Sequence, residues 1–243
     1  MIDISHRALY NSLRMNWLQD PTLEIEPWQV ENYRDMSLPL LFSRLKQHEI
    51  DLNKESFVAL ADEYETPEEF VEELIEDEDA AAQDQLYLIV FELWRRLETD
   101  KPCLSVFCDE LDHQIYLYDH GQSKSAEDLQ DTLANLKVIL DENADQGADP
   151  HEVIHSINEG CANDINAFLY DFISEQIDNS NFSYASELLD SFIQYVDDIE
   201  WFEFLHGRLL IATDPEAGEE LIQQLAHQAL KNQDLEFNLE LLA

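Results

Sequence analysis

The 243-residue sequence predicts an all-α protein, and three observations support this fold class. Glycine and proline, the residues that interrupt helices, number only 5 and 7. Apolar residues recur at steps of three and four along nearly the whole chain, which is the period of an amphipathic helix. Residues typical of helix starts and ends stand where that period breaks. We therefore expect stacked antiparallel helical hairpins, arranged as an α-solenoid (TPR-like) or as an irregular helical bundle.

The N-terminal stretch does not have the pattern of a signal peptide. It reads MIDISHRALYNSLRMNW and mixes polar and apolar residues at helical spacing. Elsewhere the sequence contains no apolar run of the roughly 18 residues that span a bilayer. These patterns predict a cytoplasmic protein that does not enter membranes.

The segment 65–84 is strongly acidic but keeps an apolar face. Phe70, Val71, Leu74 and Ile75 recur at helical spacing within it, so it predicts an amphipathic helix rather than an acidic tail. The opposite face would present its carboxylates to solvent or to a partner. The candidate partner-binding residues are Glu68, Glu69, Glu72, Glu73 and Glu76, followed by Asp77, Glu78 and Asp79.

Longer apolar stripes predict the helices that follow. The stretch 104–121 allows two interpretations, because Ile115–Tyr118 could form a strand of a hairpin. We favour a helix, since apolar residues from Leu104 to Tyr118 keep the helical period and Gly121 can end it. The three clear stripes are Leu86, Val90, Leu93 and Leu97; Leu129, Leu133, Leu136 and Leu140; and Ile154, Ile157, Cys161, Ile165, Phe168 and Phe172.

Three expected helices begin in the same way, with a capping side chain followed by proline. The capping residue accepts a hydrogen bond from a free backbone amide, and proline has no N–H that would need a partner at the first helical position. In two cases a glutamate stands three residues after the cap, where it can form a capping box. The three pairs are Thr66-Pro67, Asp149-Pro150 and Asp214-Pro215.

Two polar stretches are expected to be loops, at residues 119–125 and 142–149. We place the division of the chain near the first of them. This gives an acidic helical part at 1–122 and a hairpin-repeat-like part at 123–243, with one continuous domain as the alternative.

Residues 151–155 read HEVIH, the HExxH signature of zinc peptidases. Two histidines one turn apart can bind one Zn²⁺, and the intervening glutamate can act as general base on the bound water. Glu175 follows at a spacing that resembles the thermolysin-like family. Against catalysis, Pro150 places the motif in the first turn of a helix. The candidate zinc set is His151, Glu152, His155 and Glu175.

The overlapping residues 141–152 resemble a calcium-binding EF-hand loop. Position 6 of such a loop wants glycine for its sharp turn, but Gln146 stands there and Gly147 comes one place late. The sequence also contains no second loop to pair with it. The candidate calcium ligands, at loop positions 1, 3, 5, 9 and 12, are Asp141, Asn143, Asp145, Asp149 and Glu152.

A third interpretation of the same stretch needs no metal, and we favour it. Residues 141–148 would form a polar loop, Asp149 would cap the next helix, and Glu152 would be its capping-box partner. His151 and His155 then lie beside the apolar stripe, on its polar flank. This interpretation predicts no cofactor.

Residues 166–233 contain two successive helix pairs with about the period of tetratricopeptide repeats. Ile173 and Gln176 depart from the pattern, in place of its glycine and tyrosine, and the second unit needs a two-residue shortening. The resemblance covers roughly a quarter of the chain and implies a protein-binding surface without catalysis. The matching residues are Leu169, Phe172, Ala185 and Leu189 in the first pair, and Gly207, Leu210, Ala217 and Leu221 in the second.

The charge balance limits the possible partners. The chain carries 54 acidic and 13 basic residues, a formal net charge of −41, which repels nucleic acids and anionic membranes and attracts cationic partners. A heavily solvated surface would explain the same charge without any partner. Cys103, Cys108 and Cys161 show no CxxC spacing, so we expect neither a disulfide framework nor a structural zinc site.

The sequence contains no glycine-rich phosphate loop and no GxSxG elbow. We therefore expect a non-enzymatic interaction module, such as an adaptor, a chaperone-like factor or a regulator, whose partner is a basic protein. The alternatives are a metal-dependent protein centred on residues 141–155, with zinc or calcium, and an acidic mimic of nucleic acid.

Overall fold

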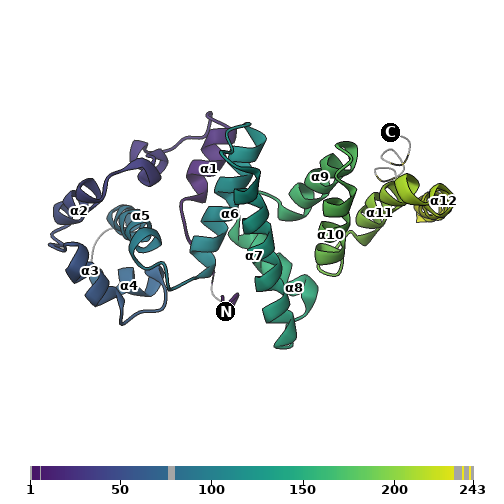
Figure 1. Cartoon of the computed structure of the whole chain (residues 1–243). Coiled ribbons are helices and arrows are strands. Elements are labelled where there is room, and N and C mark those ends of the chain that lie inside the picture. Colours follow the sequence, from purple (N-terminus) through teal and green to yellow (C-terminus); the bar gives the residue numbers. More distant parts are fainter. Residues whose placement is uncertain (1, 6, 76–79, 233–236, 238–240, 242–243) are drawn as a thin grey trace. The chain divides into compact units, whose positions relative to one another are not determined.

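The computed structural model confirms the all-α prediction (Figure 1). It describes residues 2–5, 7–75, 80–232, 237 and 241, and every regular element among them is a helix. None of these helices is both long and apolar enough to cross a membrane. The elements are α1 (Ser12–Gln19), η1 (Pro27–Val30), η2 (Tyr33–Asp35), α2 (Leu38–Gln47), α3 (Lys54–Ala61), α4 (Pro67–Leu74), α5 (Ala80–Leu97), α6 (Leu104–Asp119), α7 (Ala126–Asp145), α8 (Pro150–Gly160), α9 (Ile165–Asp178), α10 (Phe182–Phe192), α11 (Ile199–Thr213) and α12 (Pro215–Asn232).

The chain divides into two compact units. Unit 1 comprises Met1–Leu133 together with Glu159–Ala162, and therefore contains α1 to α6 and the first part of α7. Unit 2 comprises Ala134–Asn158 and Asn163–Ala243, and contains the rest of α7, most of α8, and α9 to α12.

Helix α5 forms the centre of the unit 1 core, where α2, α3 and α4 pack against it (Figure 1). Three aromatic residues from successive helices meet there. The ring centroids of Phe57 and Phe70 are 5.1 Å apart, and those of Phe70 and Trp94 are 6.2 Å apart. All three side chains are fully buried, so large apolar area from three helices stabilises this unit.

The stretch 104–121 forms a single helix, α6, so the hairpin alternative was wrong. A helix places Phe107, Leu111 and Ile115 on one face, and all three are buried. The helix ends at Asp119; Gly121 follows with a φ of +62°, and the Gln122 N–H donates to the Leu117 carbonyl over 2.8 Å. This is the glycine-ended helix terminus that the sequence predicted.

The loop expected at 142–149 is shorter than predicted, because α7 continues to Asp145. Buried Asn143 lies inside the helix, and its amide nitrogen donates to the Ile139 carbonyl over 2.8 Å. Gly147 then ends the helix at φ +98°, and the Ala148 N–H donates to the Asn143 carbonyl over 3.2 Å. The polar composition therefore did not mark the helix end, whereas the glycine did.

In unit 2, α11 and α12 approach each other closely at two glycines. A Cβ at Gly218 would lie 2.6 Å from the Ile211 backbone nitrogen and 2.9 Å from the Gly207 carbonyl oxygen, so only glycine fits there. Beside this crossing, Phe204 and Leu225 form a small buried cluster that joins the two helices. Close backbone packing and apolar contact thus hold the last helical pair together.

Candidate partner-binding surface

The acidic surface predicted for residues 65–84 is built on α4. The helix starts as the sequence predicted, because the Thr66 hydroxyl accepts a hydrogen bond from the Glu69 N–H at 3.3 Å and Pro67 is the first helical residue. Phe70 and Val71 are buried against the unit 1 core. Burial of this apolar face orients the acidic face of the helix outward.

Three of the predicted partner-binding residues, Glu69, Glu72 and Glu73, are exposed on the outer face of α4. Within the described part of the chain, no salt bridge involves any of them. Glu76 and residues 77–79, which the sequence also assigned to this surface, lie outside the described residues. The acidic surface therefore rests on the three exposed glutamates of α4.

Glu68 has a different environment from these three residues. Its carboxylate accepts hydrogen bonds from the Tyr87 hydroxyl at 3.0 Å and from the Ser105 hydroxyl. The Ser105 oxygen in turn accepts a hydrogen bond from the Leu9 N–H at 2.9 Å. Burial, followed by the adjacent Glu68 carboxylate, raises the pKa of Tyr87 well above its usual value. Glu68 thus joins α4 to α5, α6 and the N-terminal segment.

A cleft of about 380 Å³ lies beside α4. The N-terminal segment, defined as residues 9–13 and including the start of α1, and η1 supply apolar side chains to its lining, including Leu9, Leu13 and Trp28. Helices α4 and α5 supply the three charged residues that line it, Glu68, Glu72 and Asp84. No lysine or arginine lines the cleft, so it combines apolar surface with negative charge.

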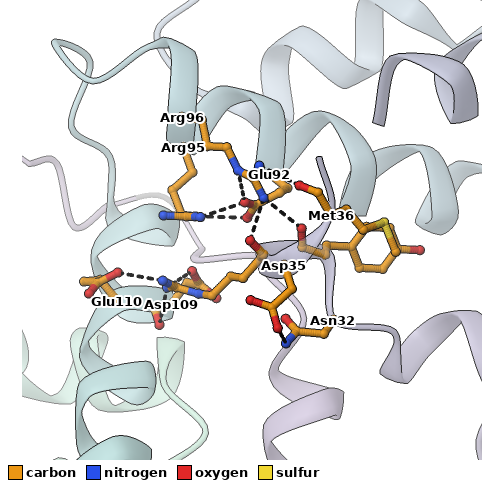
Figure 2. Close-up of polar contacts among 10 residues, drawn as sticks. Asn32, Asp35, Met36, Glu92, Arg95, Arg96, Asp109 and Glu110 are labelled. Atoms are coloured by element: carbon orange, nitrogen blue, oxygen red, sulfur yellow. Dashed lines mark hydrogen bonds and ion pairs between the residues drawn. The ribbon is translucent and has the colours of Figure 1, made fainter. Parts of the chain in front are cut away.

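Arg95 and Arg96 of α5 are held in internal ion pairs (Figure 2). Glu92, only 2% exposed, accepts hydrogen bonds from Arg95 at 2.6 and 2.9 Å and also from Arg96. The Arg96 guanidinium donates further bonds of 2.7 Å each to the carbonyls of Met36 and Arg34. Both guanidinium groups of α5 therefore stabilise the fold and are not displayed for anionic ligands.

Arg34 extends this cluster to α6. It pairs with Asp109 at 2.5 Å and with Glu110 at 3.0 Å (Figure 2). Burial raises the pKa of Asp109 despite the nearby Arg34 charge. Burial also acts to raise the pKa of Glu110, but the Arg34 charge and the hydrogen bond from Gln114 hold it below its usual value. Burial and the same arginine lower the pKa of His113 to about 4.

The lysine beside α4 is also engaged. The Lys101 ammonium donates to the carbonyls of Ala61, Asp62 and Tyr64 at 3.1, 2.8 and 2.8 Å. It also lies 5.8 Å from the centre of the Trp94 ring. This cation satisfies the C-terminal carbonyl of α3 and carbonyls of the following turn, which fixes its position at the end of α3.

Unit 2 contains a second acid-lined cavity, of about 280 Å³. Tyr170 and Trp201 line it and pack edge to face, with ring centroids 5.4 Å apart. No basic residue lines it, so a second hollow of the protein also carries negative charge. The aspartates in its lining are Asp164, Asp171, Asp197 and Asp198.

The candidate zinc residues lie on two helices of unit 2, and all four are exposed. His151 and His155 are in α8, and Glu175 is in α9. The His151 Nδ1 atom lies 3.1 Å from the Tyr195 carbonyl oxygen and 3.4 Å from an Asp197 carboxylate oxygen. Across the residues the structure describes, no three His, Cys, Asp or Glu side chains converge as a metal site would require.

The candidate calcium residues do not form a loop. Asp141, Asn143 and Asp145 belong to α7, so helical geometry spreads side chains that an EF-hand would turn inward. Asp141 is engaged by Lys137 at 2.6 Å and by the Tyr195 hydroxyl at 2.6 Å. The remaining two candidates, Asp149 and Glu152, are exposed at the start of α8.

The capping interpretation of this stretch is confirmed at Asp149. Its carboxylate accepts a hydrogen bond from the His151 N–H at 3.0 Å, and its carbonyl accepts the first helical bond from Val153 at 3.0 Å. Pro150 is the first residue of α8, as predicted. The beginning of the HExxH stretch thus forms an ordinary capped helix start.

Comparison with known proteins identifies no relative: no family model, no curated protein and no solved structure matches the chain.

Proposed function

We propose that the protein is a non-enzymatic interaction module that binds a positively charged protein through the outer face of α4. The observation that carries this proposal is that three exposed glutamates of unit 1 lack ion pairs within the described part of the chain, whereas most of its arginines form them. Glu69, Glu72 and Glu73 are exposed without ion pairs among the described residues. Meanwhile Arg34, Arg44, Arg95 and Arg96, four of the six arginines of unit 1, form ion pairs with acidic residues.

This arrangement supports attraction of a cationic surface. Because the arginine charges are neutralised locally, the outer face of α4 keeps an uncompensated negative potential. Such a potential speeds the encounter with a basic partner, and salt screens it over a Debye length of roughly 8 Å at physiological ionic strength.

The remaining helices would then act as a scaffold. We propose that α9 to α12, which carry the tetratricopeptide-like spacing, form stacked helical hairpins like those of tetratricopeptide repeats. We also propose that the protein works in the cytoplasm. A partner that normally binds DNA would make α4 a mimic of the phosphate backbone.

The test is capture of proteins from the source cell by the tagged chain at low and at high salt. The variant Glu69→Gln/Glu72→Gln/Glu73→Gln removes three charges from α4 without shortening any side chain. We expect a basic protein to be captured at low salt, and its recovery to fall at least tenfold with 0.5 M salt or with this variant. If added DNA competes with the chain for the captured protein, α4 acts as a mimic of the phosphate backbone.

A matched control changes the same number of charges elsewhere. Glu216, Glu219 and Glu220 are exposed in the first two turns of α12, as the three target residues are in α4. Their change to glutamine should leave capture within twofold of the unmodified chain. Capture that is unaffected by salt, or equally reduced by both triple variants, would rule out α4 as the binding face.

A further inference from the structure

We infer that the cleft beside α4 binds an amphipathic basic segment of the partner, with apolar side chains inserted in the cleft and lysine or arginine side chains beside α4 and α5. This inference rests on the proposed function and adds the form of the partner. The cleft holds about 380 Å³, near the lower end of the range for ligand pockets, which suits a few peptide side chains.

The apolar part of the lining is exposed to solvent. Leu9 is 40% exposed in the cleft, and Leu13, Trp28 and Ile75 are only partly buried. Covering such surface removes apolar area from water at about 25 cal/mol per Å². Trp28 offers the kind of large, rigid contact that dominates binding at protein interfaces.

The charged part of the lining comes from one side only. Glu68, Glu72 and Asp84 belong to α4 and α5, whereas the N-terminal segment and η1 contribute no charged residue to the lining. A segment with one apolar face and cations along one edge matches this asymmetry. An amphipathic helix in a groove, anchored at positions i, i+3 or i+4 and i+7, is a common form of such recognition.

The same asymmetry argues against other occupants. An anionic membrane surface would be repelled by the three carboxylates, and an uncharged apolar segment would leave the exposed Glu72 and Asp84 without partners. A purely cationic, unpatterned segment would satisfy the charges but leave Leu9 and Trp28 in water. Only a segment with both apolar and cationic groups can cover the apolar side chains of the cleft and also pair with its carboxylates.

The experiment measures binding of two labelled synthetic peptides by fluorescence anisotropy. Both contain the same leucines and lysines. One orders them so that a helix has an apolar face, and the other scrambles the order so that the charge is kept but the face is lost. We expect the amphipathic peptide to bind at least tenfold more tightly than the scrambled one, because only its binding combines apolar burial with charge attraction.

Two matched variants locate the binding. Leu9→Ser removes an exposed apolar side chain from the cleft, and Leu40→Ser removes a comparable one, 44% exposed, from α2. Because both residues are exposed, neither change should unfold the chain, which circular dichroism will verify. We expect Leu9→Ser to weaken the binding of the amphipathic peptide about tenfold, which corresponds to about 1.4 kcal/mol. Leu40→Ser should change the affinity for the amphipathic peptide less than twofold, and neither variant should change the affinity for the scrambled peptide.

The outcomes separate the two proposals. Equal binding of both peptides, with Leu9→Ser behaving like Leu40→Ser, would overturn the cleft inference and leave the acidic face of α4 standing. Binding of the amphipathic peptide that persists unchanged in Glu69→Gln/Glu72→Gln/Glu73→Gln would contradict the proposed function instead. Failure of both peptides to bind at low salt would overturn both.

Discussion

The buried carboxylate of Glu92 holds two arginines of unit 1 in ion pairs. Glu92 is the lone acid in the apolar run LYLIVFELW at 86–94, which is a sequence signal for a charge that needs partners, and Arg95 and Arg96 follow at the helical spacings i+3 and i+4. Breaking a buried ion pair by removing one partner typically costs 3–5 kcal/mol. The two arginines keep 21% and 22% of their side chains exposed, so the cost here should be lower.

We therefore expect Glu92→Gln to lower the free energy of unfolding by about 2–3 kcal/mol. Urea denaturation followed by circular dichroism measures this change. Asp131→Asn, on the exposed side of α7 in the same unit, removes one charge from the surface and should change stability by less than about 0.5 kcal/mol. Similar losses in both variants would show that the Glu92 cluster does not stabilise the fold.

His113 gives this cluster a dependence on pH. Burial and Arg34 lower its pKa from 6.5 to about 4 in the folded protein, whereas the unfolded chain keeps the ordinary value. Between pH 6.5 and 4 the unfolded state binds more protons, so stability must fall as pH falls through this window. The His113 contribution stays below about 3.4 kcal/mol, because the imidazole is partly exposed and solvent screens it. Below the folded pKa it no longer changes.

We expect His113→Gln to reduce the loss of stability between pH 6.5 and 4, because glutamine takes up no proton there. Urea denaturation at half-unit pH steps measures the slope in both proteins. His206→Gln removes an exposed histidine from α11 and should leave the slope unchanged. An unchanged slope in His113→Gln would mean that this histidine is protonated equally in the folded and unfolded states.

At the scale of elements, the start of α8 depends on its cap. We expect Asp149→Ala to lower the free energy of unfolding by about 1 kcal/mol, because the His151 N–H loses its acceptor. An asparagine side chain caps a helix almost as well as aspartate, so Asp149→Asn should keep most of the stability. Thermal unfolding of the three proteins measures both changes. An equal loss in Asp149→Asn would assign the effect to charge rather than to capping.

The placement of the candidate ligands in α7 and α8 bears on the metal alternatives. Because Asp141 and Asn143 lie within α7 and His151 lies in the first turn of α8, we expect protein purified without chelator to contain neither stoichiometric zinc nor calcium. Elemental analysis measures both metals. Zinc that is lost with His155→Ala would favour the peptidase hypothesis, and calcium-dependent stabilisation that is lost with Asp141→Ala would favour the EF-hand hypothesis.

Helix boundaries show what the sequence could and could not predict. The helix end at Gly121 was predicted, since glycine adopts the left-handed backbone without strain. Gly147 follows α7 in the same conformation, but the sequence placed a loop from residue 142 onward. The comparable ends at Glu49 and Ser180, with φ of +64° and +62°, carry no such signal. Both residues are exposed, and backbone hydrogen bonds from the following Ile50 and Asn181 N–H groups to the Leu45 and Gln176 carbonyls close these helix ends.

The candidate surface was predictable to a similar degree. The helical period placed Glu69, Glu72 and Glu73 on the outer face of α4 correctly. The same period could not distinguish Glu68, because its hydrogen-bond partners Tyr87 and Ser105 come from α5 and α6. Local spacing identifies the face of a helix, but not which distant elements contact that face. The apolar cleft was missed for the same reason.

At the scale of the whole molecule, the net charge of −41 should lower the stability of the fold and strengthen the binding of a basic partner. Like charges repel one another in the compact state, and salt screens this repulsion. We expect an increase from about 10 to 500 mM sodium chloride to raise the unfolding midpoint by about 2–4 °C, which corresponds to roughly 1 kcal/mol for a chain of this size. Over the same range, affinity for a basic partner should fall, because the same screening weakens attraction between opposite charges.

The two α4 and α12 triple variants separate these effects. Each removes three negative charges, so both should reduce the salt dependence of the unfolding midpoint to a similar extent, as measured by differential scanning calorimetry. Only Glu69→Gln/Glu72→Gln/Glu73→Gln should also reduce the salt dependence of partner binding, since only these residues would meet the partner. If the α12 variant reduced both dependences equally, the whole negative field and not the face of α4 would attract the partner.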